Sequence, residues 1–425
     1  MNMRESIFNY FNTKFFYGWI IVGVANLGIF SSGPGQSHTF SVFVGPISRD
    51  LEMSTTSIAS AYGLATLIAA FLLPHMGKLI DKYGSRLSLI IISIILGFSC
   101  IFFGAASNFL MLTVGFGFLR FFGQGSLMLG CANIVSQWFD NKRGFALSIM
   151  GLGFGISMAI HPPLSQVLID QFGWKYAWVI LGVSTWIVMV PALYILAWNA
   201  PETVGLKPDG AIKSTDNKNK VEEIEGLNLS EAIKERSFYI LSAMWFGMAM
   251  LVTTLHFYQV TILTSQGIAS DFAAGLFSIS AISMVLFMPF VGKLFDNYPT
   301  RYVLALGLTI NTISLISITF VNNEFYAILY AIIFGVNNAI SMTMFGYIWP
   351  RYFGRKHIGS IQGTGQMIGV VGASLGPLPV GFAIDYIGNS LMIIRYLSLY
   401  PIIIAIITVL FLKTPSSLSI NKKLE

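Results

Sequence analysis

Long apolar runs alternate with short polar stretches along almost the whole chain. Each run is close to the roughly 20 residues that carry an α-helix across the hydrocarbon core of a bilayer. The runs are continuous rather than alternating, and lipid offers no partner for backbone N–H and C=O groups, which favours helices over strands. Twelve spans are predicted, at residues 17–43, 56–76, 87–106, 109–135, 144–168, 175–198, 238–264, 271–291, 302–321, 325–348, 359–384 and 392–412.

The longest polar stretch separates the first six predicted spans from the last six. It contains Lys213-Ser-Thr-Asp-Asn-Lys-Asn-Lys220 and then three glutamates, a composition that does not form a packed core. Its last residues, from Leu229 to Arg236, are expected to form a short surface helix. The predicted organisation is an N-terminal six-helix bundle at 1–199, a cytoplasmic linker at 200–236 and a C-terminal six-helix bundle at 237–425.

Charged residues are scarce and lie almost entirely between the apolar runs. The chain is 55% hydrophobic and 10% charged, whereas an average soluble domain is about a quarter charged. Of the 25 Lys and Arg residues, 21 fall on one side of the predicted spans, three on the other, and Arg120 within a span. Because positive residues gather on the cytoplasmic side, this distribution predicts a multi-pass protein with both termini inside. The short termini and the lack of sorting segments are those expected of a protein of the cytoplasmic (inner) membrane. It also explains a pI of 9.1 without a nucleic-acid partner.

The two predicted halves repeat a loop sequence. Gly77-Lys-Leu-Ile-Asp81-Lys-Tyr-Gly84-Ser-Arg86 recurs as Gly292-Lys-Leu-Phe-Asp296-Asn-Tyr-Pro-Thr-Arg301, displaced by 215 residues. Pro162 and Pro377 match at the same displacement, as do the segments that begin at Asp170 and Asp385. Repeated helical halves are an architecture of many secondary transporters.

The repeated loop resembles the signature of the major facilitator superfamily, which joins spans two and three and is repeated between spans eight and nine. The resemblance covers the whole chain and implies an all-α membrane protein of twelve helices in two pseudo-symmetric six-helix bundles. It also implies that the loop latches one half in a given conformational state and is not a substrate site. The loop residues that carry the resemblance are Gly77, Asp81, Gly84, Arg86, Gly292, Asp296 and Arg301.

A finer resemblance points to the monocarboxylate-porter group and its oxalate–formate antiporter relatives. Phe16-Tyr-Gly-Trp19 is similar to the start of that group's first span, and Trp138-Phe-Asp-Asn-Lys-Arg-Gly-Phe-Ala146 is similar to its second signature. Two positions depart from the group. Met288 stands where its porters often carry a carboxylate-binding arginine, and Gln366 lies near the place of a lysine in its oxalate-type members.

Arg120 is the one formal charge well inside a predicted span, and burying it in the membrane costs a few kcal/mol. One interpretation is a cation that binds an anion or gates its path. The other is structural, because Arg120 to Gly125 resembles the superfamily's R-x-x-x-G-x-G pattern in span four, where the arginine braces spans one and four. Both interpretations remain open.

The predicted spans contain histidines but no acidic residue in mid-membrane. Buried carboxylates usually relay protons in symporters, so any coupled proton here needs a histidine or the substrate's own carboxyl group. His38 and His256 lie in spans one and seven, 218 residues apart. Each histidine either binds the substrate or a proton, or only forms a hydrogen bond to a neighbouring helix. His161 precedes two prolines, and a kink is the simpler explanation of that segment.

Other polar residues within the spans complete the predicted substrate-binding set. Amides and hydroxyls can bond a substrate, or equally a neighbouring helix. Ser32-Gly-Pro-Gly35 interrupts span one, either to expose backbone groups to substrate or as a simple kink. The full predicted set is Arg120, His256, Gln259, Asn337, Asn338, Tyr258, His38 and Gln124.

The resulting expectation is a secondary active transporter of small organic anions, monocarboxylates foremost, that works by alternating access with proton coupling or exchange. The alternative is a proton-linked exporter of amphipathic compounds. An enzyme is not expected, because the predicted spans contain no Asp pair, no H-E-x-x-H motif and no Cys/His cluster. A primary pump is not expected either, because the sequence contains no G-x-x-x-x-G-K-[ST] loop. Cys100 and Cys131 lie in apolar runs, so no metal or cofactor is expected. The expected partners are the transported anion, the lipid bilayer and protons, and the protein is expected to be a monomer.

Overall fold

The computed structural model describes residues 3–139, 142–210, 226–353 and 358–415, with some side chains inside these ranges left undefined. The regular elements in these ranges are helices, as the apolar runs predict. The chain divides into two compact units, one of residues 1–43 and 68–219 and the other of residues 44–67 and 220–425. The predicted organisation at 1–199, 200–236 and 237–425 follows the order of the spans and stays a prediction; the packing assigns the start of the second span to the second unit.

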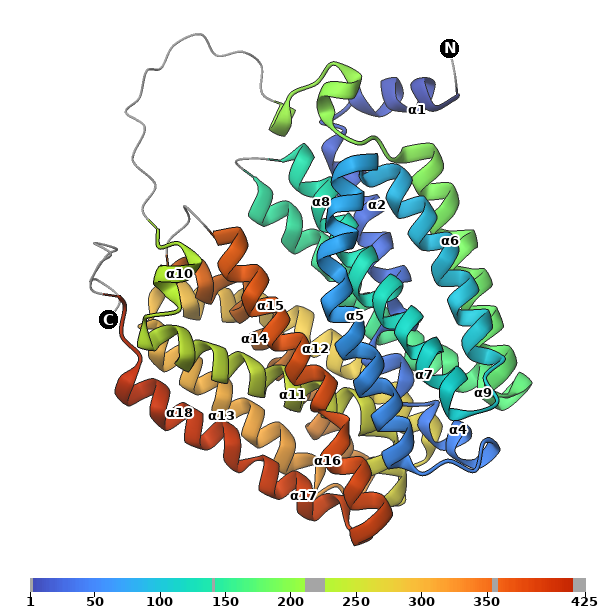
Figure 1. The fold of residues 1–425 in the computed structure, drawn as a ribbon, viewed down its shortest axis with the longest axis vertical. Helices are drawn as coiled ribbons and strands as arrows, with labels where there is room; N and C mark the ends of the chain where they lie inside the picture. Colours follow the sequence, from blue (N-terminus) through green and yellow to red (C-terminus); the bar gives the residue numbers. More distant parts are fainter. Residues whose placement is uncertain (1–2, 140–141, 211–225, 354–357, 416–425) are drawn as a thin grey trace. The chain divides into compact units, whose positions relative to one another are not determined.

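The first unit contains the first, third, fourth, fifth and sixth predicted spans and the end of the second. Its α1 lies across the ends of the longer helices (Figure 1), and Arg4 of α1 donates to the carbonyl of Ala197 at 2.8 Å. Its elements are α1 (Met3–Asn12), α2 (Gly18–Ser31), η1 (Gly33–Gly35), α3 (Ser37–Phe40), the end of α5 (Thr55–Tyr83), α6 (Ser85–Gly104), α7 (Phe109–Phe118), the π-helical η2 (Leu119–Leu127), α8 (Met128–Trp138), α9 (Arg143–Leu196), η3 (Pro201–Val204) and η4 (Pro208–Gly210).

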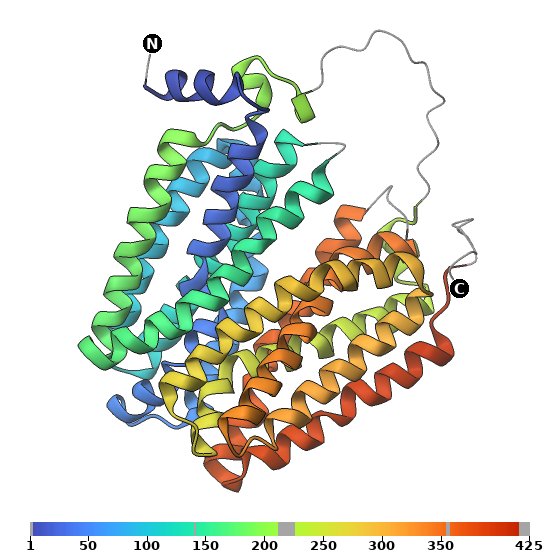
Figure 2. The same cartoon turned by 180° about the vertical axis from the view of Figure 1, so that it is seen from behind.

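The second unit contains the last six predicted spans and the first part of α5. Its short α10 begins at a capping box in which Asn228 and Glu231 satisfy each other's backbone N–H groups, within the predicted surface helix. Figure 2 shows α13 and α18 side by side. The elements are α4 (Val44–Asp50), α10 (Leu229–Ala232), α11 (Arg236–Ser265), α12 (Ser270–Asn297), α13 (Thr300–Ile318), α14 (Glu324–Phe353), α15 (Ile358–Leu375), α16 (Pro377–Phe382), the π-helical η5 (Ala383–Ile387), α17 (Ser390–Leu397) and α18 (Leu399–Phe411).

The predicted spans can be traced through the described helices. Nine helices in the described ranges are long and apolar enough to cross a membrane. One of them, Phe145–Leu196, holds two predicted spans that meet at Gly173, where φ of 77° and ψ of 161° interrupt the helix. The first predicted span is α2 followed by α3, and the fourth is α7, η2 and α8 in succession. These account for the twelve spans.

The sequence repeat is also a repeat of helix boundaries. Three helices of the first half and three of the second begin 215 residues apart, the displacement found in the loop sequences. The side chains of Asn108 and Asn323, also 215 apart, accept from backbone N–H groups of the helices that they precede, at 3.0 and 3.1 Å. The paired first residues are Thr55 and Ser270, Ser85 and Thr300, and Phe109 and Glu324.

The first copy of the signature loop is fastened to the end of α9. Gly84 has φ of 82° and ψ of 151°, a conformation essentially restricted to glycine, and a Cβ there would lie 2.8 Å from Nδ2 of Asn199. Asn199 in turn accepts from the backbone N–H of Arg86 at 2.9 Å. The guanidinium of Arg86 donates to the carbonyl of Tyr194 at 3.0 Å. The side chain of Asp81 lies outside the described part of the chain, and the latch role of the loop stays a prediction.

The second copy of the loop is built differently. Pro299 replaces the glycine and precedes α13 with φ of −56°. Arg301 donates to the hydroxyl of Tyr302 at 3.3 Å and lies over that ring at 4.9 Å. The side chain of Asp296 lies outside the described residues. The two copies therefore share a sequence pattern but not a backbone conformation.

Asp385 explains why the start of α5 belongs to the second unit. Its Oδ1 accepts from the N–H of Thr55 at 3.2 Å and from the hydroxyl of the same residue, and its Oδ2 accepts from the N–H of Thr56 at 2.6 Å. The hydroxyl of Tyr258 donates to the carbonyl of Thr55 at 3.3 Å. A carboxylate at a helix N-terminus satisfies orphan N–H groups and complements the helix dipole.

Gly84→Ala is expected to destabilise the first unit, because alanine strains this backbone conformation and its Cβ meets Asn199. We expect a loss of about 1–3 kcal/mol, seen as a lower unfolding temperature in detergent. Gly151→Ala is the matched control, because a Cβ at that helical glycine meets no atom within 4 Å. Equal unfolding temperatures for the two variants would contradict the strained turn.

Asp385→Asn is expected to loosen the first turn of α5, because the amide loses the charge and one of the two acceptor oxygens. We expect about 1 kcal/mol less protection of the amides after Thr55, measured by hydrogen exchange. Asp170→Asn serves as the control, since Asp170 is the equivalent residue of the first half and accepts from Gln166 of its own helix. Unchanged exchange in Asp385→Asn would show that the cap contributes little.

Candidate functional site

The break in the first span is the centre of the polar structure in the first unit. Gly33–Gly35 forms a single 3₁₀ turn, and Gln36 then adopts an extended conformation with φ of −93° and ψ of 148°. The Gly-Pro-Gly sequence favours such an interruption because proline cannot continue the hydrogen-bond ladder. The Thr39 hydroxyl donates to the Gly33 carbonyl at 2.6 Å, so the break supplies its own partners. Residues 31–44 are all buried.

Arg120 reaches this break from η2. Its Nη1 donates to the carbonyl of Gly35 at 2.8 Å and to Oγ of Ser37 at 3.4 Å. Gly35 also lies directly against Gly123, since a Cβ on Gly35 would be 2.9 Å from the Gly123 Cα atom. These contacts join spans one and four, which is the bracing arrangement. Binding of an anion by the same guanidinium stays a prediction.

His38 takes part in a chain of hydrogen bonds between spans one and five. Its Nε2 lies 3.2 Å from Oγ of Ser157, and that oxygen lies 3.1 Å from Nδ1 of His161. The ring of His38 meets Phe154 edge-on, and the ring of His161 packs against Phe30. His161 is therefore part of a polar cluster, and a kink does not describe its whole role.

His256 lies in an aromatic setting in the second unit. It is buried on α11, with its ring 4.8 Å from that of Phe334 and 6.2 Å from that of Phe277. One turn further along α11, Gln259 is fully buried and accepts from the Tyr330 hydroxyl at 3.1 Å. Since the rings of Tyr330 and Phe334 stack at 5.7 Å, His256 and Gln259 share one wall of α14.

The side chains of Asn337 and Asn338 on α14 have different hydrogen-bond partners. Asn337 accepts from Nδ2 of Asn311 on α13 at 3.4 Å, whereas Asn338 donates to the carbonyl of Phe334 in its own helix at 3.0 Å. All three asparagines are fully buried. These two bonds, one between helices and one within a helix, are of the kind that stabilise bundles by about 0.6 kcal/mol each. Substrate binding by Asn337 and Asn338 stays a prediction.

Two other predicted site residues occupy different settings. The hydroxyl of Tyr258 is directed to Thr55 at the start of α5, so it holds a helix end together in the second unit. Gln124 lies half-buried on η2, and its backbone is in close contact with Gly35. The structure thus brings His38 and Arg120 to one region of the first unit, and His256 and Gln259 to one region of the second.

Several residues of these clusters were not predicted from the sequence. Ser157 and Tyr330 are ordinary polar residues of apolar helices, and only the helix packing makes them partners of His38 and Gln259. The pattern offered one usable signal, because Ser157 and His161 are four residues apart and share a helix face.

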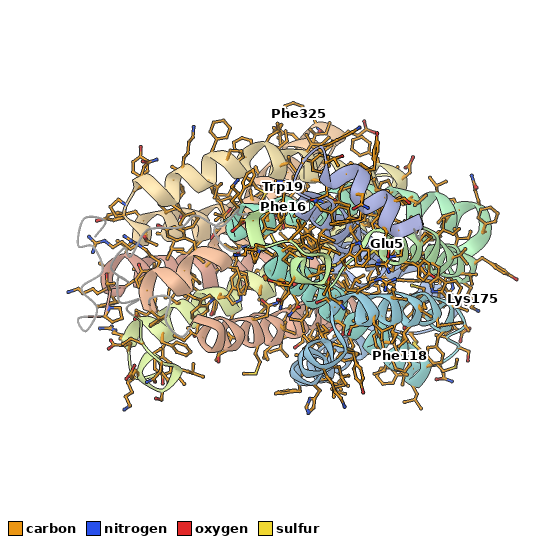
Figure 3. The ribbon with its side chains drawn as sticks, turned by 90° about the horizontal axis from the view of Figure 1, so that it is seen from above. Glu5, Phe16, Trp19, Phe118, Lys175 and Phe325 are labelled. Carbon is orange, nitrogen blue, oxygen red and sulfur yellow. The ribbon has the colours of Figure 1, made fainter. Side chains whose placement is uncertain are left out.

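The two finer signature segments pack against each other. The ring of Phe16 lies 5.9 Å from that of Trp138, and the ring of Trp19 lies 4.8 Å from that of Phe139. Figure 3 shows Phe16 and Trp19 next to each other in the first unit. The segments thus form one aromatic cluster at the beginning of span one and the end of span four.

A family model described as the Major Facilitator Superfamily matches residues 25–265 and 257–425. The chain belongs to the Major Facilitator Superfamily. It is therefore a multi-pass membrane transporter of a small-molecule substrate and not an enzyme. Both the expected fold class and the expected family are confirmed.

Curated relatives of this superfamily member include carboxylate transporters and an efflux pump. Human monocarboxylate transporter 2 is 24% identical over 88% of this chain and 80% of its own length. The oxalate:formate antiporter of Oxalobacter formigenes is 21% identical over 50% of this chain and 48% of its own length. The multi-drug resistance efflux pump PmrA homolog of Lactococcus lactis is 21% identical over 79% of this chain and 82% of its own length.

A solved structure has the same fold. The bacterial homolog of the human lysosomal transporter Spinster, in an inward-facing and occupied conformation, superposes with a TM-score of 0.67. The likeness covers 92% of this chain and 95% of that chain at 15% sequence identity. It supports the helical architecture of this superfamily member and carries no information about its substrate.

Tyr330→Phe is expected to destabilise the second unit, because it leaves the buried Gln259 carbonyl oxygen without this donor. The loss should be about 1–3 kcal/mol, measured as a lower unfolding temperature in detergent. Tyr326→Phe is the matched control, one turn earlier on α14 and 48% exposed. A variant at Tyr330 as stable as that at Tyr326 would show that this bond contributes nothing measurable.

Proposed function

We propose that this transporter carries small organic anions, monocarboxylates foremost, by alternating access coupled to protons or to exchange of a second anion. The observation that carries the proposal is Arg120. Among the side chains that the structure describes, it is the only Asp, Glu, Lys or Arg that is fully buried, with 2% of its surface exposed. A cation kept in a membrane span is costly, and such residues usually mark the path of a substrate or ion.

The setting of Arg120 suits a carboxylate. Nη1 donates to the Gly35 carbonyl and the Ser37 hydroxyl, and a guanidinium has five N–H donors in a planar fork. A carboxylate can accept two of these donors side by side, which gives geometric specificity as well as affinity. In this proposal the brace and the anion site are two uses of one side chain.

The relatives support the substrate class in part. The monocarboxylate transporter spans most of this chain, and the name of the antiporter gives two small carboxylates as its substrates. Within the second unit, His256, Gln259 and Tyr330 offer uncharged hydrogen-bonding groups. Aromatic faces at Phe334 and Phe277 beside His256 suit a small apolar tail.

A second candidate function is export of amphipathic compounds driven by protons. The similarity to the efflux pump over 79% of this chain favours it. Met288 also favours it, because it places a flexible apolar side chain where monocarboxylate porters often carry an arginine, and methionine is common at promiscuous binding surfaces.

The proposed location is the cytoplasmic membrane, with both termini inside. The distribution of 21 Lys and Arg residues on one side of the spans against three on the other supports the orientation of the termini. We further propose that the monomer suffices for transport.

The test is uptake of labelled lactate, pyruvate and larger carboxylates into proteoliposomes, with and without an imposed pH gradient. We expect saturable uptake by the unaltered protein and at least about a tenfold loss in Arg120→Gln, since a charge-assisted bond is lost. Arg120→Lys should retain part of the uptake because it keeps the charge and one donor.

The matched control is Arg395→Gln, because Arg395 bonds Thr319 at an exposed position of the second unit. Uptake by Arg120→Gln equal to that of the unaltered protein would leave Arg120 with a bracing role alone. A folded protein that takes up no carboxylate would contradict the anion proposal and favour the exporter, to be tested with a fluorescent amphipathic cation.

A further inference from the structure

A continuous hydrogen-bonded chain of two imidazoles and a hydroxyl lies inside the first unit. It runs from His38 on α3 through Ser157 to His161 on α9, with heavy-atom separations of 3.2 and 3.1 Å. His38 and Ser157 are fully buried, and His161 keeps 5% of its surface exposed. The chain therefore links two titratable groups across spans one and five, with His161 as its more accessible end.

The backbone fixes the direction of the hydrogen bonds. Nδ1 of His161 also lies 3.2 Å from the carbonyl oxygen of Ser157, and a carbonyl only accepts, so this nitrogen carries the proton. The Ser157 hydroxyl then accepts from His161 and donates to Nε2 of His38. Nε2 of His38 is thus the acceptor at the end of an aligned chain.

Few groups compete for a proton in this region. Among the described side chains, no Asp or Glu is fully buried. The elements packed against the chain contribute little charge: residues 18–31 of α2 and 33–35 of η1 contain no ionisable side chain, and α8 and the middle of α6 contribute only the buried thiols of Cys131 and Cys100. Arg86, at the start of α6, is bonded to the end of α9.

A buried charged group, Arg120 on η2, contacts the residues that precede His38. Its guanidinium donates to Ser37, the residue next to His38, and to the carbonyl of Gly35. His161 packs over the same break, because a Cβ on Gly33 would meet its ring. The imidazoles and the guanidinium are thus arranged around one turn of span one.

We propose that His38, Ser157 and His161 form the proton-binding site that couples transport to a proton gradient, which rests on the proposed function. A proton adds to Nε2 of His161 as the Nδ1–H bond of that ring breaks and its proton passes to Oγ of Ser157. The hydroxyl proton of Ser157 passes to Nε2 of His38. His161 ends neutral with its proton on the other nitrogen, Ser157 is unchanged, and His38 becomes an imidazolium.

Arg120 makes this site sensitive to an anion. The guanidinium of Arg120 is bonded to Ser37, next to His38, and it repels a positive charge on the His38 ring. An anion bound at Arg120 offsets that repulsion, and by linkage the proton strengthens anion binding by the same factor. Proton and anion then bind together and leave together, which is the requirement for symport.

The first test compares uptake driven by a pH gradient with exchange of labelled lactate at equal pH, in proteoliposomes. We expect the ratio of driven uptake to exchange to fall at least about tenfold in Ser157→Ala, because the hydroxyl that joins the two rings is gone. Ser165→Ala is the matched control, since Ser165 lies two turns further along α9 and is equally buried. Equal ratios in the two variants would overturn the proposal.

The second test does not depend on transport. Nitrogen NMR of labelled histidine rings in lipid nanodiscs, assigned with His38→Gln and His161→Gln, follows protonation between about pH 4 and 8. We expect the titrations of His38 and His161 to depend on each other, and to become independent in Ser157→Ala but not in Ser165→Ala. Independent titration in the unaltered protein, or no titration of either ring, would overturn the proton site. Coupled titration without carboxylate uptake would keep the site and reject the substrate class.

Discussion

A backbone that crosses lipid must satisfy its own hydrogen bonds, and the first span meets this constraint at a place where its helix is broken. The turn at Gly33–Gly35 frees carbonyl groups that would be costly if left bare. Thr39 and Arg120 donate to two of them, and Gly123 lets span four approach closely enough for Arg120 to do so. Thr39 and Arg120 therefore lie at the break because the interrupted helix leaves carbonyl groups that need hydrogen-bond donors.

Much of the fold could be predicted because span length and repetition are local properties of the sequence. The break in span one was also predictable, since Gly-Pro-Gly interrupts a helix whatever packs against it. Partners across helices were not, because a serine in an apolar helix gives no sign of which helix it will face. Ser157 lies 119 residues from His38, and Asp385 lies 330 residues from Thr55. The bond from Tyr258 to Thr55 spans 203 residues and could not be predicted for the same reason, and substrate binding by Tyr258 stays a prediction.

The two units differ in the chemistry that they bury. The first holds a guanidinium and two linked imidazoles, all able to carry positive charge. The second holds uncharged amides and a phenol among stacked rings, at Gln259, Tyr330 and Asn337. His256 is the exception, and it too is enclosed by aromatic rings.

The two copies of the repeated loop differ in the backbone conformation of one equivalent residue. A glycine at residue 84 occupies a backbone region that proline cannot enter, and a proline at residue 299 occupies one that needs no glycine. The first copy therefore cannot accept the proline of the second, whereas the second copy can accept the glycine of the first. A chimera that carries the second loop at the first site is expected to misfold, because proline cannot adopt the conformation of Gly84. A chimera that carries the first loop at the second site is expected to fold, because glycine can adopt the conformation of Pro299.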